Sequence, residues 1–221
     1  APQAATPAAA RTAAQNSSMD ALLFYQLLIG EMELSAGRAG NAYDVILDAA
    51  RRHNDASLFQ RAVEIALQAR AGEQALAAAR AWRKAVPDSV DALRFQAQIV
   101  LALNRPDEVV EPIAAWLLDA PAAERPALIA GLPRLLQRVA DRRLALSLLE
   151  RMVSPYKDLP GTRVPSQVAL GRLHLAAGMP DQALALARQA ASEDQASAGP
   201  VLLAMELLPG TPAAEAIVTA Y

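Results

Sequence analysis

The distribution of apolar residues divides the chain into a short leader and a long helical array. Residues 1–18 are mostly Ala, Pro, Gln, Thr and Ser, with almost no large apolar side chain. Such a segment buries too little surface to offset its ordering entropy, so we expect a flexible leader. The pattern then changes to DALLFYQLLIGEMEL, which is typical of an amphipathic helix. Residues 19–221 are predicted to form one helical array.

Two segments of this array repeat each other at a fixed interval. Trp82 and Trp116 are 34 residues apart, and so are Pro87 and Pro121. The segments ALAAARAWRKAVPD and VVEPIAAWLLDAP are therefore copies of one unit, whose length is that of a helix–turn–helix repeat. Because the closing proline cannot continue a helix, the chain turns before the next unit begins. The pattern predicts an all-α, right-handed superhelical solenoid of about five to six helix pairs.

Small residues recur where the paired helices should cross. Helices approach to about 8–10 Å only where the contacting side chains are small. Gly30 and Gly171 occupy this position in the first helix of units one and five. The alanines expected to face the first helices are Ala42, Ala75, Ala145 and Ala183.

The register is expected to stretch toward the end of the array. The proline- and glycine-rich stretch SPYKDLPGTRVP predicts a long loop between units four and five. A sixth first helix is recognisable in ASAGPVLLAMELL, followed by the short segment TPAAEAIVTAY. Without a polar capping helix there, we expect a truncated or uncapped array.

Residues 22–196 resemble a tetratricopeptide-repeat (TPR) protein on this spacing, the small residues and the closing prolines. The match is good in units one, three and five and weaker in units two and four. Most of the family's bulky aromatics are absent from the first helices, where one such position holds Gln26, Phe59, Leu93, Ile129 and Gln167. The resemblance implies a scaffold that holds another protein or a peptide in its concave groove.

Residues 33–93 resemble, more narrowly, proteobacterial outer-membrane lipoproteins with a TPR array. In one such group the array is an adaptor for a carboxyl-terminal processing protease and its substrates. This resemblance implies a periplasmic scaffold that is attached to the outer membrane through a lipid. The chain begins at Ala1 and contains no cysteine, so a lipid-accepting cysteine would have to precede it. A removed export signal and a trimmed sequence both fit this start, and a cytoplasmic location stays open.

The candidate binding groove follows from the aligned first helices. One row along it contains Glu31, Glu64, Gln98, Arg134 and Arg172, so the groove is expected to change from acidic to basic along its length. Such a groove suits an extended or helical peptide that is oriented by charge and held by apolar pockets. The complete set of predicted groove residues is Phe24, Leu27, Glu31, Leu34, Gln60, Glu64, Leu67, Arg94, Gln98, Leu101, Arg134, Arg138, Arg172 and Leu175. Ordinary solvated charges are the alternative reading.

Composition and motifs indicate no catalytic chemistry. The formal net charge of −2 argues against a nucleic-acid binder, and no apolar run reaches the roughly 20 residues of a membrane helix. The only histidines are His53 and His174, far apart in sequence and predicted to be a surface residue and a core or boundary residue. The sequence contains no Walker A, G-x-S-x-G or G-x-G-x-x-G motif. We therefore expect no enzyme activity, no cofactor and no metal site.

The tryptophans and the end of the array leave alternatives. Because Trp82 and Trp116 share one repeat position, we expect both to pack between helices rather than to bind a partner. The chain could instead belong to a secretion or polysaccharide-export assembly. A second alternative is self-association through the C-terminal end, around Val201, Leu202, Leu203 and Leu207.

Overall fold

The computed structural model describes residues 21–221, and the leader predicted for residues 1–18 lies outside this range. The described chain contains twelve α-helices, two 3₁₀ turns and no strand. The elements are α1 (Ala21–Ser35), α2 (Ala39–His53), α3 (Ala56–Gln68), α4 (Gly72–Ala85), α5 (Val90–Ala102), η1 (Pro106–Val109), α6 (Val110–Asp119), α7 (Arg125–Leu136), α8 (Arg142–Val153), α9 (Arg163–Ala176), α10 (Pro180–Glu193), α11 (Ala198–Leu207), η2 (Pro212–Ala214) and α12 (Glu215–Thr219).

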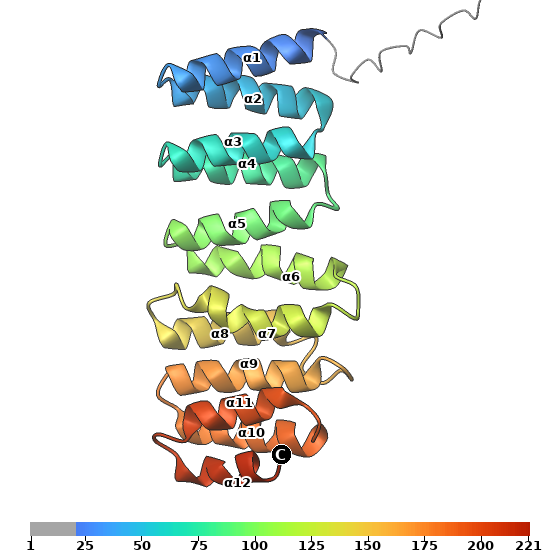
Figure 1. Cartoon of the computed structure of the whole chain (residues 1–221), viewed down its shortest axis with the longest axis vertical. Helices are drawn as coiled ribbons and strands as arrows, with labels where there is room; N and C mark the ends of the chain where they lie inside the picture. Colours follow the sequence, from blue (N-terminus) through green and yellow to red (C-terminus); the bar gives the residue numbers. More distant parts are fainter. Residues whose placement is uncertain (1–20) are drawn as a thin grey trace, which may run out of the picture.

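The helices pair in chain order and the pairs stack into an elongated solenoid, with α1 at one end and α12 at the other (Figure 1). Apolar side chains buried between the pairs form a nearly continuous core along the stack. A single pair would leave one apolar face bare, so the stability of each pair depends on its neighbours. The predicted all-α solenoid is confirmed.

Glycine permits the close approach of paired helices where the sequence predicted it. A Cβ added to Gly30 would lie 2.6 Å from Cδ1 of Ile46 in α2. A Cβ on Gly171 would collide with the tip of Leu203 in α11 and would lie 3.6 Å from the carbonyl oxygen of Ala183 in α10. Ala183 is fully buried. The small residues therefore close these helix contacts as predicted.

Polar side chains cap three of the helices. The Asp55 carboxylate accepts backbone N–H bonds at the start of α3, including one of 2.8 Å from Ser57. Ser89 accepts from the N–H of Ala92 in α5, and Asp141 caps α8 in the same way. Each cap satisfies N–H groups that the first turn of a helix leaves without a partner.

The way the pairs stack changes along the molecule. In the first part the second helix of a pair lies along the first helix of the next, as α2 does with α3 and α4 with α5. Farther on, α7 packs mainly against α9, and α6 has little contact with α7. Arg125, at the start of α7, joins this region by donating to the carbonyls of Leu117 and Ala120 at the end of α6 and by covering the Tyr156 ring.

The later part of the chain departs from the expectation in two places. The loop after α8 is shorter than predicted, because α9 already begins at Arg163 and is preceded by a buried hydrogen bond from the Thr162 hydroxyl to the Tyr156 carbonyl. After α11 the chain forms η2 and the short helix α12, which packs on α10 and α11 through the buried Ile217. A short helix thus lies where none was expected.

The predicted self-association surface at this end is largely core. Leu203 and Leu207 are buried, and Val201 is half-buried. Only Leu202 of the four is well exposed. Leu203 and Leu207 lie inside the layer formed by α9 to α12. The expectation that the four residues form one surface is therefore wrong.

Candidate functional site

A cavity of about 580 Å³ opens between α5, α6 and α7, in the middle of the stack. Trp116 and Ile113 of α6 form one wall, and Leu128, Leu132 and Leu135 of α7 form another. The guanidinium groups of Arg94, Arg134 and Arg138 and the amides of Gln98 and Gln137 complete its lining. Apolar walls with a few polar groups are the usual composition of a binding pocket. We call this space the central cavity.

The local sequence of α7 explains why this space is open. The side of α7 that lines the cavity includes Ala127 and Gly131, which contribute almost no side-chain volume. A Cβ added at Gly131 would meet nothing within 4 Å. Since α7 also carries no aromatic side chain, nothing from this helix fills the space over Trp116. The cavity is therefore open because the small residues Ala127 and Gly131 of α7 do not fill the space beside the large indole of Trp116.

The cavity is basic, because no aspartate or glutamate is among its lining residues. Arg94 is paired with Asp91, one turn earlier in α5, at 2.7 Å. Arg134 and Arg138 are exposed, and neither has an acidic group within 4.0 Å in residues 21–221. Two guanidinium groups with free donors beside an apolar wall suit a carboxylate attached to an apolar segment.

A second hollow of about 860 Å³ continues from this cavity along α7, α9 and α11. Arg134 and Gln137 line both spaces, so the two adjoin. In the second hollow Arg172 is held by Glu206 at 3.1 Å, and Arg142 donates to the backbone carbonyls of Gln137 and Val139. Together the two spaces make a basic track from α5 to α11.

Several arginines of the earlier units, by contrast, are neutralised by acids of the neighbouring unit. Arg61 of α3 makes a double hydrogen bond to Glu31 of α1, and this bond raises the pKa of Arg61. Between α4 and α6, Arg83 pairs with Glu111, which raises the pKa of Arg83 in the same way. These pairs connect one unit to the next and leave no charge free for a ligand.

Several residues predicted for the groove lie together around these two spaces. Those of the central cavity come from α5 and the end of α7, and those of the second hollow come from α7 and α9. The predicted residues in the first space are Arg94, Gln98, Arg134 and Arg138, and those in the second are Arg134, Arg172 and Leu175.

The predicted groove residues of the first two units do not join them. Glu31 is occupied by Arg61, and the amide of Gln60 donates to Glu64 at 2.8 Å. Phe24 and Leu67 are exposed, whereas Leu27 and Leu34 pack partly against the core. Leu101 is buried, because α5 turns that side toward its neighbours, so it presents no side chain to a ligand. The acidic half of the predicted row is thus mostly bound within the protein.

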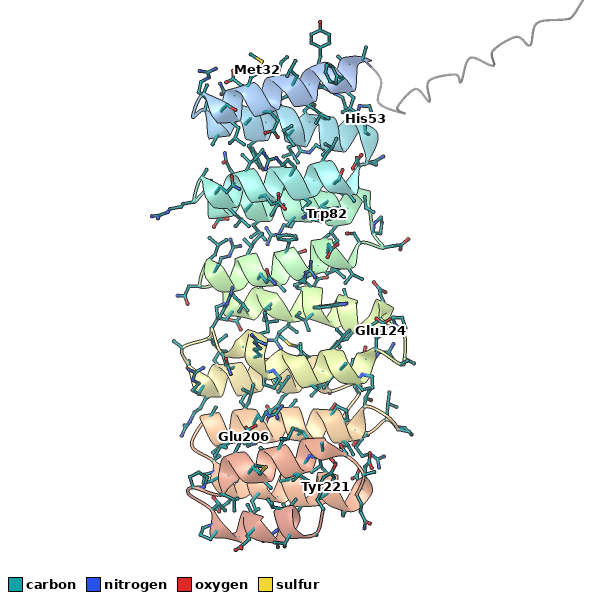
Figure 2. All side chains as sticks on the ribbon, viewed as in Figure 1. Met32, His53, Trp82, Glu124, Glu206 and Tyr221 are labelled. Carbon is teal, nitrogen blue, oxygen red and sulfur yellow. The ribbon has the colours of Figure 1, made fainter. Side chains whose placement is uncertain are left out.

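The two tryptophans differ, contrary to the expectation of one shared environment. Trp82 is 2% exposed and lies between α4 and α5, with its ring 5.9 Å from that of Phe95 (Figure 2). Its indole N–H has no hydrogen-bond partner among the described residues. Trp116 is only half-buried and forms a wall of the central cavity. The prediction of a core position is right for Trp82, whereas Trp116 packs partly against the core and also borders the cavity.

Part of the site lies outside the predicted groove. Leu128, Gly131 and Leu135 are not among the predicted groove residues, although all three line the cavity. Gly131 was detectable as a glycine inside a helical pattern, which usually has a packing or functional reason. Nothing in the sequence distinguished Trp116 from Trp82, because both share one place in the repeat.

The described residues offer little for other kinds of chemistry. No group of three His, Cys, Asp or Glu side chains there could hold a metal ion. His53 is exposed at the end of α2, and His174 is half-buried with Nδ1 2.9 Å from the Leu170 carbonyl oxygen, which agrees with their predicted surface and boundary positions. None of the helices in residues 21–221 is both long and apolar enough to cross a bilayer.

The comparisons with known proteins found likeness only among solved structures. No family model matches the chain, and no curated protein matches it either. The structure of PilW, a widely conserved type IV pilus biogenesis factor, is similar at 16% identity over 91% of this chain and 90% of that one, with a TM-score of 0.41. A TPR protein of Parabacteroides merdae matches at 12% identity over 89% of this chain and 77% of that one, with a TM-score of 0.45. The TPR protein TTC0263 of Thermus thermophilus matches at 19% identity over 84% and 99%, with a TM-score of 0.37.

Proposed function

We propose that this protein is a non-catalytic scaffold that binds an acidic, partly apolar peptide segment of a partner protein along the basic track from α5 to α11. The observation that carries the proposal is the central cavity, where Arg134 and Arg138 lie free beside the apolar wall of Trp116. Carboxylates of the ligand would pair with the guanidinium groups, and its apolar side chains would cover the indole. The continuation toward Arg172 gives room for several residues of a peptide.

The cellular setting of this scaffold is proposed from the sequence alone. The likeness of residues 33–93 to outer-membrane TPR lipoproteins supports a periplasmic adaptor, and a processing protease or its substrates are the proposed partners. A component of a secretion or polysaccharide-export assembly is the rival role. A pull-down from periplasmic extract tests the setting: a specific partner that is lost with Arg134→Glu/Arg138→Glu supports the adaptor.

Trp116 provides a direct test of the binding chemistry. In a Trp82→Phe background the fluorescence reports Trp116 alone, since the chain has two tryptophans. Short peptides of Asp and Leu should shift this emission, and matched peptides of Lys and Leu should not. Arg134→Glu/Arg138→Glu should weaken binding of the acidic peptides by at least about tenfold, and added salt should weaken it as well.

A matched double variant controls for net charge. Arg143 and Arg151 are exposed on α8 and line neither space, so Arg143→Glu/Arg151→Glu changes the charge equally without touching the site. Binding should be unchanged in this control. If both double variants lost the same affinity for the acidic peptides, or if acidic and basic peptides bound equally well, the central cavity would not be what selects the ligand.

A further inference from the structure

The largest group of exposed apolar side chains lies on α1, at the end of the stack. The exposed fraction is 58% for Leu22, 63% for Tyr25, 46% for Ile29 and 61% for Met32. Large apolar side chains are more often buried in folded proteins. Figure 2 shows Met32 on the side of α1 that faces away from the rest of the stack. Phe24 and Leu28 flank this row and are exposed as well.

The row has the spacing of a coiled-coil seam. From Leu22 the steps to Tyr25, Ile29 and Met32 are three, four and three residues, which is the a/d pattern of two helices that pack along each other. The opposite side of α1, with Leu27, Gly30 and Leu34, already packs against α2 and the core. A helix that is apolar all round is normally covered on both sides. The spacing thus indicates that a second helix covers the outer row.

The charges around this row favour a neutral partner surface. No charged residue occurs from Ala21 to Gly30. The two acids that follow are already paired within the chain, Glu31 with Arg61 and Glu33 with Arg38. A charged partner would therefore gain nothing here, whereas an identical α1 meets this face without repulsion and without burying an unpaired charge.

The size of the surface also suits a second copy. Six large side chains at these exposures present on the order of 600 Å² of apolar surface, the upper end of what a monomer typically leaves open. Two such faces together bury about 1,200 Å², the lower limit for a specific stable interface. The opposite end of the stack has fewer exposed large apolar side chains, since α11 and the last residue expose Leu202, Met205 and Tyr221, and α12 itself exposes Glu215, Ala216 and Thr219. Face-to-face pairing of two α1 helices fits better than a head-to-tail chain.

We propose that the protein forms a twofold homodimer in which the outer row of α1 packs antiparallel against the same row of a second copy. A twofold axis across the helices brings Tyr25 of one copy opposite Ile29 of the other, and Leu22 opposite Met32. The basic tracks of the two copies remain open, because α5 to α11 lie away from this end (Figure 1). The dimer does not depend on the proposed peptide binding.

Light scattering of the full chain over the micromolar range tests the dimer. The expected particle has twice the chain mass of 23.4 kDa, with no larger species as concentration rises. Tyr25→Lys/Ile29→Lys should weaken the dimer by at least about tenfold while the circular dichroism spectrum stays unchanged, because both side chains are exposed in one copy. A strict monomer, or open-ended growth, overturns the proposal.

A matched control and a cross-linking measurement locate the interface. Leu202→Lys/Met205→Lys changes the exposed apolar pair of α11 and should leave the dimer intact; loss of the dimer in this variant alone places the interface elsewhere and overturns the proposal. The chain has no cysteine of its own, so single cysteines report cleanly. Tyr25→Cys chains should form disulfides with Ile29→Cys chains in a mixture, and each should pair poorly with itself. If disulfides formed mainly between two Tyr25→Cys chains or between two Ile29→Cys chains, the antiparallel arrangement would be excluded.

Discussion

Trp82 and Trp116 occupy one position of the repeat in two very different settings. Around Trp82 the interface between α4 and α5 is closed, and Phe95 packs against the indole. Around Trp116 the next helix, α7, keeps its distance and presents Gly131 to the space between them. The same residue type therefore contributes to the core in one unit and to the wall of a cavity in the next. The repeat position determines which way a side chain points, and the neighbouring unit determines whether it is covered.

The largest expected effect compares the two tryptophans directly. Trp82→Ala should lower the free energy of unfolding by about 3–5 kcal/mol, because it empties a fully enclosed site. Trp116→Ala should cost well under half as much, since much of the indole already borders open space. Urea unfolding followed by circular dichroism measures both. Equal losses would mean that Trp116 is as well packed as Trp82, and the comparison would fail.

The next effect compares two glycines inside helices, one at a closed contact and one at the open cavity. Gly30→Ala should reduce the free energy of unfolding by about 1–2 kcal/mol, because the new methyl group would press on Ile46, which is only 1% exposed. Gly131→Ala should increase it by about 0.5–1 kcal/mol, because alanine favours the helix and its Cβ meets nothing. Thermal unfolding of the two variants should shift Tm in opposite directions. Shifts of the same sign would show that the α7 surface is not open.

The smallest effect concerns the paired charges of the first unit. Arg38 donates two hydrogen bonds to Glu33 and, with Asn41, lowers the pKa of Glu33 to about 2 from an ordinary 4.5. This contribution to stability is complete above pH 4.5 and is lost as the pH falls toward 2. Glu33→Gln should therefore have a lower Tm than the wild type near neutrality, and the difference should shrink as the medium is acidified.

The free arginines of the central cavity supply the control for that measurement. Arg134→Gln/Arg138→Gln removes no ion pair and adds no carboxylate, so the Tm gap between this variant and the wild type should not narrow over the same acid range in the way that the Glu33→Gln gap does. A Glu33→Gln gap that persists at low pH would contradict the pairing with Arg38.

Much of the architecture was predictable because it depends on local and periodic features. The interval from Trp82 to Trp116 gave the length of the unit, and Gly30 marked a helix crossing that the structure confirms. These features need only helix geometry and the volume of a side chain to be interpreted. Part of the candidate site was accessible in the same way, since Arg94, Arg134 and Arg138 follow from counting along the first helices.

The remaining features of the site depend on contacts that counting positions along the first helices does not reveal. Glu31 and Glu64 belong to the predicted groove, but Arg61 of α3 pairs with Glu31 of α1 and lies 4.0 Å from Glu64 on its own helix. Leu101 has the correct spacing for the groove, yet it is buried. The pairing of Glu31 depends on a side chain of another unit that comes within reach, and small changes in the angle between units alter such contacts.

The sequence by itself determined the helices, their pairing and the length of the repeat, because these arise from interactions between residues close together in the chain. Only the tertiary structure decided which interfaces close and which stay open. Side-chain volumes on separate units must match before a gap is filled, and the small residues of α7 do not fill the space beside Trp116. The same holds for charge: an arginine is neutralised or left free for a ligand according to whether a neighbouring unit brings a carboxylate within a few ångströms.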